Sequence, residues 1–225
     1  MKVTTDACLF GGFVAKEIQN PGSKIQNVLD IGTGTGLLAL ILAQKNPDIS
    51  IDALEIDKNA YEQAGQNISA SPWNERISVF HADAKVFKPR SRYDAIVSNP
   101  PFYENEIEGN TIQKNIAHHS HGLLLKDLLF FIKINLAPNG MFYLLLPYKR
   151  NAEIKKLLFK NEFDITQMIF VRQSVKHDYF RIILEGRIGS ASPAETKISE
   201  ISIMDEQQKY SNEFIQLLKD YYLHL

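Results

Sequence analysis

Strand-like and helix-like runs alternate along most of the chain, and this alternation restricts its fold more than any other feature. The apolar run "NVLDIG" is followed by "TGLLALILAQKNP", which has helical length and ends at a proline. The β-branched run "SIDALEID" precedes the polar helix candidate "KNAYEQAGQNISAS", and "RISVFHAD", "YDAIVSN" and "MFYLLLPY" read as further strands. Such alternation is typical of an α/β fold in which helices cover both faces of a mostly parallel sheet.

The last third of the chain departs from strict alternation. "DITQMIFVRQ" and "YFRIILEGRI" read as an antiparallel strand pair, followed by the strand-like "EISIM" and the amphipathic helix "SNEFIQLLKDYYLHL". Before them, "GLLLKDLLFFIKINLAPNG" predicts one helix closed by Pro138 and Gly140. The only linker-like stretch, "GSASPAETK", is too near the end to separate a second domain. We therefore expect one domain over 1–225, with an N-terminal helix and cofactor motif (1–22), a core sheet (23–188) and a C-terminal strand and helix (189–225).

Composition and charge exclude several classes of protein. The chain has no apolar run near the roughly 18 residues of a membrane span, and its start carries Asp6 where a signal peptide needs an apolar core. A single cysteine, Cys8, suits a reducing cytoplasm. The net charge of −1 argues against a general nucleic-acid coat but allows local basic patches, one of which includes Lys149 and Arg150. We expect a cytoplasmic protein without a membrane segment.

A glycine loop joins the first strand to the first helix of the alternating region. In "VLDIGTGTGLLAL", Gly32, Gly34 and Gly36 have G-x-G-x-G spacing, whereas a dinucleotide fingerprint needs its third glycine at Leu37. Glycines let the backbone pass close to a ligand, where a Cβ would collide. The spacing therefore favours a nucleoside-bearing cofactor without pyrophosphate over NAD.

Acidic residues end three successive predicted strands, and ligands of open α/β sheets bind outside these carboxyl ends. Asp30 could accept from a cofactor ammonium group, Glu55 could take both ribose hydroxyls, and Asp83, with the Ala84 amide beside it, could reach an adenine amine. Asp30, Asp57 and Asp83 could instead cap helices. We prefer this structural role for Asp57, just before a helix candidate, and the cofactor role for Asp30 and Glu55.

The run "SNPPF", at the end of the fourth strand, resembles the Asn-Pro-Pro-aromatic motif of amino-methylating class I S-adenosylmethionine-dependent methyltransferases. The resemblance implies that the Asn99 side-chain oxygen and the Pro100 carbonyl accept the two hydrogens of a planar amine or amide. It also implies that Phe102 stacks on the substrate, while Pro100 and Pro101 stiffen the platform. Two directed acceptors suit this chemistry, because an adenine N6 lone pair is delocalised and must be held in line with the methyl group. The cofactor-side residues that we expect are Thr5, Asp6, Asp30, Gly32, Thr33, Gly34, Gly36, Glu55, Ile56, Asp83, Ala84 and Asn99.

A closer resemblance extends over nearly the whole chain, from "MKVTTDACLFG" to "YSNEFIQLLKDYYL", and is to the bacterial valine-tRNA adenine-N6 methyltransferases. It implies a Rossmann-like fold, S-adenosylmethionine as cofactor, a tRNA partner and methylation of an adenine beside the anticodon. It also places Thr5 and Asp6 beside the methionine tail of the cofactor, although a Thr/Asp N-cap for the following helix is a second interpretation. The chain departs from this family where it starts at the "KVTTDA" motif and where His118 replaces a frequent arginine.

Other functions compete with tRNA methylation. Protein glutamine N5-methylation uses the same platform, but those enzymes carry a helical substrate domain in front, whereas here the first strand starts near Asn27. DNA adenine methylation is a weaker alternative, because no separate base-reading domain is apparent. An NAD-dependent oxidoreductase is opposed by Leu37, where the dinucleotide fingerprint needs a glycine. The complete glycine loop with Asn99 and Phe102 argues against a non-catalytic RNA-binding scaffold. His118, His119 and His121 lack the spacing of helical zinc pairs, so we expect no metal. A monomer is the favoured state.

Overall fold

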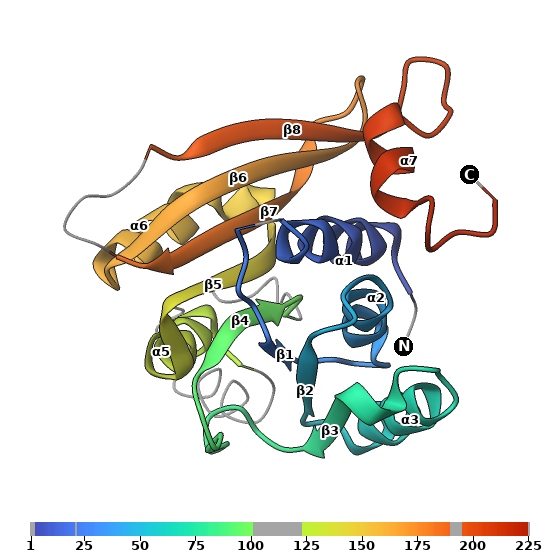
Figure 1. Cartoon of the computed structure of the whole chain (residues 1–225). Helices are drawn as coiled ribbons and strands as arrows, with labels where there is room; N and C mark the ends of the chain where they lie inside the picture. Colours follow the sequence, from blue (N-terminus) through green and yellow to red (C-terminus); the bar gives the residue numbers. More distant parts are fainter. Residues whose placement is uncertain (1–2, 21, 101–122, 190–194, 225) are drawn as a thin grey trace, which may run out of the picture.

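One eight-stranded sheet organises the protein. The computed structural model describes residues 3–20, 22–100, 123–189 and 195–224. Within them the strand order is β3-β2-β1-β4-β5-β7-β6-β8, as Figure 1 shows. The strands are β1 (Asn27–Ile31), β2 (Ser50–Glu55), β3 (Ile77–His81), β4 (Tyr93–Ser98), β5 (Leu136–Pro147), β6 (Phe163–Ser174), β7 (Tyr179–Ile188) and β8 (Lys197–Met204).

Most neighbouring strands run in the same direction. β3, β2, β1, β4 and β5 pair in parallel, β7 is antiparallel to both β5 and β6, and β8 is parallel to β6. The predicted mostly parallel sheet is confirmed, and so is the antiparallel pair near the C-terminus, which is β6 and β7. Since β1 lies between β2 and β4, the strand order reverses there, and open α/β sheets bind ligands at such a point.

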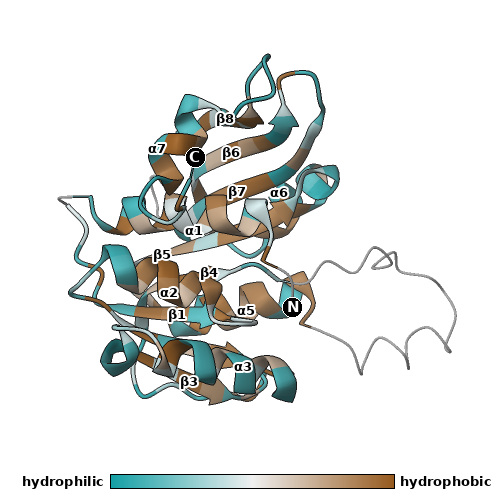
Figure 2. Cartoon of the chain, turned by 90° about the vertical axis from the view of Figure 1, so that its right-hand side faces the viewer, coloured by the Kyte–Doolittle hydropathy of each residue, from teal (hydrophilic) through white to brown (hydrophobic). Residues whose placement is uncertain are grey.

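Helices cover both faces of the sheet. They are α1 (Thr5–Ile18), α2 (Leu37–Lys45), α3 (Lys58–Ser69), α5 (Leu125–Asn135), α6 (Asn151–Lys160) and α7 (Asn212–Leu218), with short 3-10 turns η1 (Asn74–Arg76) and η2 (Tyr148–Arg150). Alternate residues of a strand face opposite sides, so Val28 packs with α1, α2 and α7, whereas Leu29 packs with α5 and α6. In Figure 2 apolar residues are concentrated along the strands and in α2 and α5, as expected for two cores separated by one sheet.

Two helix ends differ from the sequence-based expectation. α5 ends at Asn135, and the Leu136–Gly140 stretch predicted to be helical already belongs to β5. Leu136 is fully buried and lies in register with Tyr93 of β4, so sheet pairing takes this stretch, and Pro138 cannot donate to a helix. α7 ends at Leu218, because the chain turns there and Tyr221 and Tyr222 pack back against the core.

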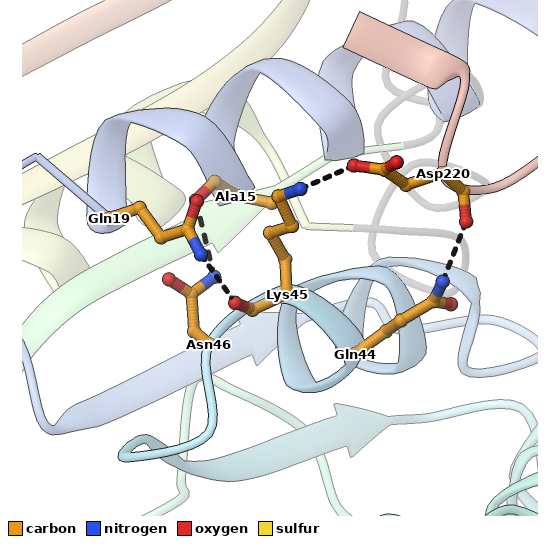
Figure 3. Close-up of polar contacts among 6 residues, drawn as sticks. All are labelled: Ala15, Gln19, Gln44, Lys45, Asn46 and Asp220. Carbon is orange, nitrogen blue, oxygen red and sulfur yellow. Dashed lines mark hydrogen bonds and ion pairs between the residues drawn. The ribbon is translucent and has the colours of Figure 1, made fainter.

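Polar contacts join the segment after α7 to α2, and the end of α2 to the end of α1, as Figure 3 shows. The Lys45 ammonium pairs with the Asp220 carboxylate, and Gln44 Nε2 donates to the Asp220 carbonyl oxygen at 2.7 Å. From the other side, Gln19 Nε2 donates to the Lys45 carbonyl oxygen at 2.7 Å. These contacts fix the end of α2 and leave its beginning, with the glycine loop, at the opposite edge of the sheet. No helix of the described residues is long and apolar enough to cross a membrane.

Candidate functional site

The carboxyl ends of three central strands meet at one edge of the sheet. Asp30 of β1 lies in register with Ala53 of β2 and with Val97 of β4. Ile31 lies in register with Ser98, whose hydroxyl donates to the Ile31 carbonyl oxygen at 2.8 Å. The residues that follow, the glycine loop after β1 and Asn99 after β4, therefore leave the sheet side by side.

The glycine loop adopts a backbone that favours glycine at three positions. Gly32, Gly34 and Gly36 have φ angles of 72°, 60° and 86°, in the left-handed region that side chains disfavour. The N–H groups of Gly32 and Thr33 both donate to the Leu54 carbonyl oxygen at 2.9 Å, which ties the loop to the end of β2. Gly36 is the N-cap of α2. The loop is thus a tight turn without side chains at its three left-handed positions.

Asp30 is a fully buried acid at the start of this loop. Its Oδ2 accepts from the Thr33 hydroxyl at 2.6 Å, whereas its Oδ1 has no hydrogen-bond partner within the described residues. Burial raises the pKa of Asp30 from 3.8 to about 7, the Thr33 hydrogen bond opposes this rise, and the nearby Glu55 charge adds to it. A buried carboxylate oxygen without a partner is suited to receive a cation, such as the predicted cofactor ammonium.

Glu55 ends β2 with only 7% of its surface exposed. Oε2 accepts from the Gly34 N–H at 2.8 Å, and Oε1 accepts from the Asp57 N–H at 2.9 Å. The Asp57 side chain accepts from the Ala60 N–H at 2.9 Å, so its predicted role as the N-cap of α3 is confirmed. Glu55 therefore holds both the glycine loop and the turn into α3, while its oxygens keep lone pairs for a ligand.

His81 is a residue near this site that the sequence reasoning missed. Its Nε2 lies 3.0 Å from the carbonyl oxygen of Ile56, and because a carbonyl only accepts, Nε2 carries the proton. The imidazole stacks on Tyr61 of α3, with ring centroids 5.3 Å apart. The bond from His81 fixes the backbone of Ile56, and Ile56 is 60% exposed, so its apolar surface stays accessible. The histidine directly before "AD" at a strand end was the available signal.

Asp83 and Ala84 follow β3 at the same edge of the sheet. Asp83 Oδ1 accepts from the Lys85 N–H at 2.8 Å, and the Asp83 carbonyl oxygen accepts from the N–H groups of Val86 and Phe87. Ala84 is buried, at 6% exposure. The local turn therefore positions this acid one strand beyond Glu55, on the side of the site away from β4.

Asn99 and Pro100 follow directly after β4. Asn99 is half-buried and Pro100 is buried. Pro101 and Phe102, the other residues of the predicted amine platform, lie outside the described residues, as do His118, His119 and His121. Within the described part of the chain, no cluster of three or more His, Cys, Asp or Glu side chains could hold a metal ion.

Thr5 and Asp6 begin α1. The N-cap is Thr4, which makes no side-chain capping bond. Asp6 Oδ1 accepts from the Ala7 N–H in the first turn at 3.1 Å, so this acid does contact the start of the helix, and Oδ2 pairs with Arg181 Nε at 2.8 Å. Arg181 lies in register with Pro147 at the carboxyl end of β5. The ion pair thus fixes the start of α1 at the same edge of the sheet as Asn99.

These groups together fit a nucleoside cofactor that carries an ammonium group. The partnerless Asp30 oxygen matches the cation, Glu55 offers further lone pairs, and the glycine turn has no side chain at its three left-handed positions. A cofactor of this kind has no pyrophosphate, so the site needs no groups that bind one.

Comparisons with known proteins identify the family and the fold of the chain. A family model described as the methyltransferase small domain matches residues 12–140. A relative from Flavobacterium johnsoniae, named tRNA1(Val) (adenine(37)-N6)-methyltransferase, is 37% identical over 227 residues, covering 100% of this chain and 94% of that protein. A relative of the same name from Pseudoalteromonas translucida is 35% identical over 225 residues, covering 100% and 93%.

Solved structures show the same fold at low sequence identity. A predicted O-methyltransferase from Agrobacterium tumefaciens has a TM-score of 0.73 at 14% identity, and the match covers 95% of each chain. A glycopeptide N-methyltransferase in complex with S-adenosyl-L-methionine has a TM-score of 0.57 at 12% identity, covering 79% of this chain and 94% of that one. At such identities the likeness concerns the fold alone.

Proposed function

The chain belongs to the methyltransferase small domain family, within the class I S-adenosylmethionine-dependent methyltransferases, and we propose that it methylates N6 of adenine 37 in tRNA1(Val). The observation that carries this proposal is the position of Asn99. It follows Ser98, which is in register with Ile31, so an amine acceptor leaves the sheet directly beside the start of the glycine loop. Relatives that match the whole chain and carry this activity in their names support the choice of substrate.

Each residue of the site has a role in this proposal. Asp30 binds the ammonium group of the cofactor, Glu55 binds the ribose hydroxyls, and Asp83 with the Ala84 amide binds the adenine amine. Ile56 packs against the cofactor adenine, and Thr5, Asp6, Gly32, Thr33, Gly34 and Gly36 surround the methionine end. Bound S-adenosylmethionine supplies an activated methyl group, so the protein needs no strong base.

The platform after β4 orients the substrate amine. The Asn99 side-chain oxygen and the Pro100 carbonyl accept the two N6 hydrogens and direct the nitrogen lone pair toward the methyl group. Phe102 stacks on the adenine, and Pro100 and Pro101 keep the acceptors rigid. Positioning of this kind lowers a barrier by about 7–11 kcal/mol in the best intramolecular cases.

We also propose that residues 1–225 act as one domain, because β8 and α7, from the segment 189–225, join the same sheet and the same core as α1. A cytoplasmic monomer without a metal is the further proposal.

Methyl transfer to defined RNA tests the proposal. The purified protein, tritiated S-adenosylmethionine and unmodified tRNA1(Val) should yield N6-methyladenosine after digestion, and a transcript with guanine at position 37 should yield none. Asn99→Ala should bind the cofactor with nearly normal affinity and lose most of the transfer. Ser98→Ala, which removes only the bond to Ile31, is the matched control. An Asn99→Ala enzyme with wild-type turnover would exclude the amine platform.

A further inference from the structure

Three aromatic rings from η2, β6 and β7 meet just beyond the end of β5. Tyr148 of η2 lies 5.2 Å from Tyr179 of β7 and 5.3 Å from Phe170 of β6, and the last two rings are 5.5 Å apart, all between centroids. We call these three residues the aromatic cluster. The rings meet at 81°, 53° and 46°, so no ring lies flat on another. All three side chains are half-buried, which leaves part of each accessible.

The aromatic cluster lies at the same edge of the sheet as Asn99. β6 runs parallel to β5, because both are antiparallel to β7, so the carboxyl ends of β5 and β6 share this edge with the beginning of β7. Tyr148 directly follows the last residue of β5, and Tyr179 is the first residue of β7. With strands about 4.8 Å apart, β7 and β6 lie about 10 and 14 Å from β4, which is about three to four rises of stacked bases.

A fixed arginine extends the aromatic cluster. The Arg172 guanidinium lies 5.5 Å from the centroid of the Tyr179 ring. Its Nε donates to the Ser202 hydroxyl at 2.8 Å, and it pairs with Glu200 at 3.5 Å. Tyr179 donates its hydroxyl to the same Glu200. Lys149 and Lys176 are exposed in the adjoining turns. The surface therefore combines aromatic rings, a planar cation and lysines at one edge.

This combination matches single-stranded RNA. Proteins hold unpaired bases by stacking them on aromatic rings and on arginine planes, and lysines contact the phosphates. A base that enters an active site must leave its stack, so its neighbours lose a stacking partner. A second stacking surface about 10–14 Å from the amine acceptor would restore that contact.

We propose that the aromatic cluster and Arg172 bind the bases of the nucleotides next to the methylated adenine. This inference rests on the proposed function, and it adds a specificity surface for the loop that carries the target. The surface selects an open loop over a duplex, because paired bases do not present their faces.

Initial rates against tRNA1(Val) concentration test the inference with paired variants. Tyr179→Leu and Tyr148→Leu keep much of the side-chain volume and lose the ring, and the KM for tRNA should rise about 5- to 100-fold. The kcat at saturating tRNA and the affinity for S-adenosylmethionine should stay near wild type. Tyr148→Phe and Tyr179→Phe keep the ring and should retain a near wild-type KM. Tyr210→Leu is the matched control, since that ring stacks on Phe214 of α7, 4.6 Å away between centroids.

An RNA-side measurement separates stacking from loss of packing. With an anticodon stem-loop that has an abasic nucleotide beside the target, the KM of the wild type should rise. The KM of the Tyr179→Leu enzyme should rise little further on the same substrate, because its stacking contact is already lost. The inference is overturned if the effects of the abasic nucleotide and of Tyr179→Leu on KM are fully additive. It is also overturned if folded leucine variants have an unchanged KM, the result expected if the surface binds a protein instead. If a leucine variant unfolds, the KM of Arg172→Lys for the intact and the abasic stem-loop replaces that measurement. A wild type that transfers no methyl group to tRNA contradicts the proposed function itself, which is a different outcome.

Discussion

The carboxylate oxygen Oε2 of Glu55 accepts a hydrogen bond of 2.8 Å from the backbone N–H of Gly34. Gly34 has a φ angle of 60°, in the left-handed region that favours glycine. The other oxygen accepts from Asp57 at the start of α3. One buried side chain therefore connects the glycine loop of β1 with the turn after β2. In the proposed function, the same carboxylate also binds the ribose.

Replacing this carboxylate should weaken cofactor binding. Glu55→Ala removes the charged acceptor of two hydroxyls and the anchor of the glycine loop. The loss of a hydrogen bond to a charged group costs about 1.5–3 kcal/mol, so the affinity for S-adenosylmethionine should fall about tenfold or more in calorimetry. Asp57→Ala is the control: it should lose about 0.5–2 kcal/mol of stability with the cap of α3 and keep most of the affinity. Unchanged binding by Glu55→Ala would remove this residue from the site.

The stability of the protein without its cofactor should depend on pH through Asp30. Its pKa is raised from 3.8 to about 7 in the folded state by burial. Between these two values the folded protein binds more protons than the unfolded chain, so the free energy of unfolding should decrease as pH rises from about 4 to 7. Asp30→Asn keeps the size of the side chain without its charge, and should flatten this decrease in urea titrations. Parallel pH profiles for the two proteins would contradict the assignment.

Cofactor binding should be linked to the same proton. An ammonium group beside Asp30 favours the carboxylate, so binding below pH 7 should release a proton from the protein. Calorimetry in buffers of different ionisation enthalpy measures this release, and Asp30→Asn should abolish it.

RNA binding should depend on salt through the turn after β5. Lys149 is exposed there, next to Arg150, which donates to Glu153 through bonds of 2.9 and 2.7 Å. Each phosphate contact contributes about 0.7–0.9 to the slope of log affinity against log salt. Lys149→Glu should weaken tRNA binding and flatten this slope, while the affinity for S-adenosylmethionine stays constant.

The control for this reversal is on the opposite edge of the sheet. Lys16 is exposed in the last turn of α1, a helix that begins at the site edge with the Asp6–Arg181 pair. Lys16→Glu makes the same change of net charge and should leave the salt slope as it is. If both reversals act alike, the effect belongs to net charge and the RNA contacts lie elsewhere.

The sequence predicts those features whose signals are local. The spacing of Gly32, Gly34 and Gly36 predicted a tight loop, and all three have positive φ angles. The acid just before a polar helix predicted the Asp57 cap, which is confirmed. Strand–helix alternation predicted the parallel part of the sheet, because a parallel pair needs a crossover that a helix supplies.

Contacts between distant segments were not predictable in this way. The bond between His81 and the Ile56 carbonyl joins two strand ends, and the Asp6–Arg181 pair joins residues 175 positions apart. The local pattern gives no register for such pairs, since register depends on how the strands are ordered. For the same reason the parallel pairing of β8 with β6 was not predicted, although its strand character was. The roles of the site residues in binding and catalysis stay predictions.

Two glycines on different helices give opposite predictions for stability. A Cβ on Gly12 of α1 would lie 2.7 Å from the Leu217 carbonyl oxygen and 2.9 Å from Leu218 Cδ2, whereas a Cβ on Gly65 of α3 would meet nothing within 4 Å. Gly12→Ala should therefore push α7 away and cost about 1–3 kcal/mol in urea unfolding. Gly65→Ala should stabilise the protein by about 0.5–1 kcal/mol, because alanine has the higher helix propensity. A Gly12→Ala protein as stable as the wild type would mean that α7 does not pack on α1 at this point.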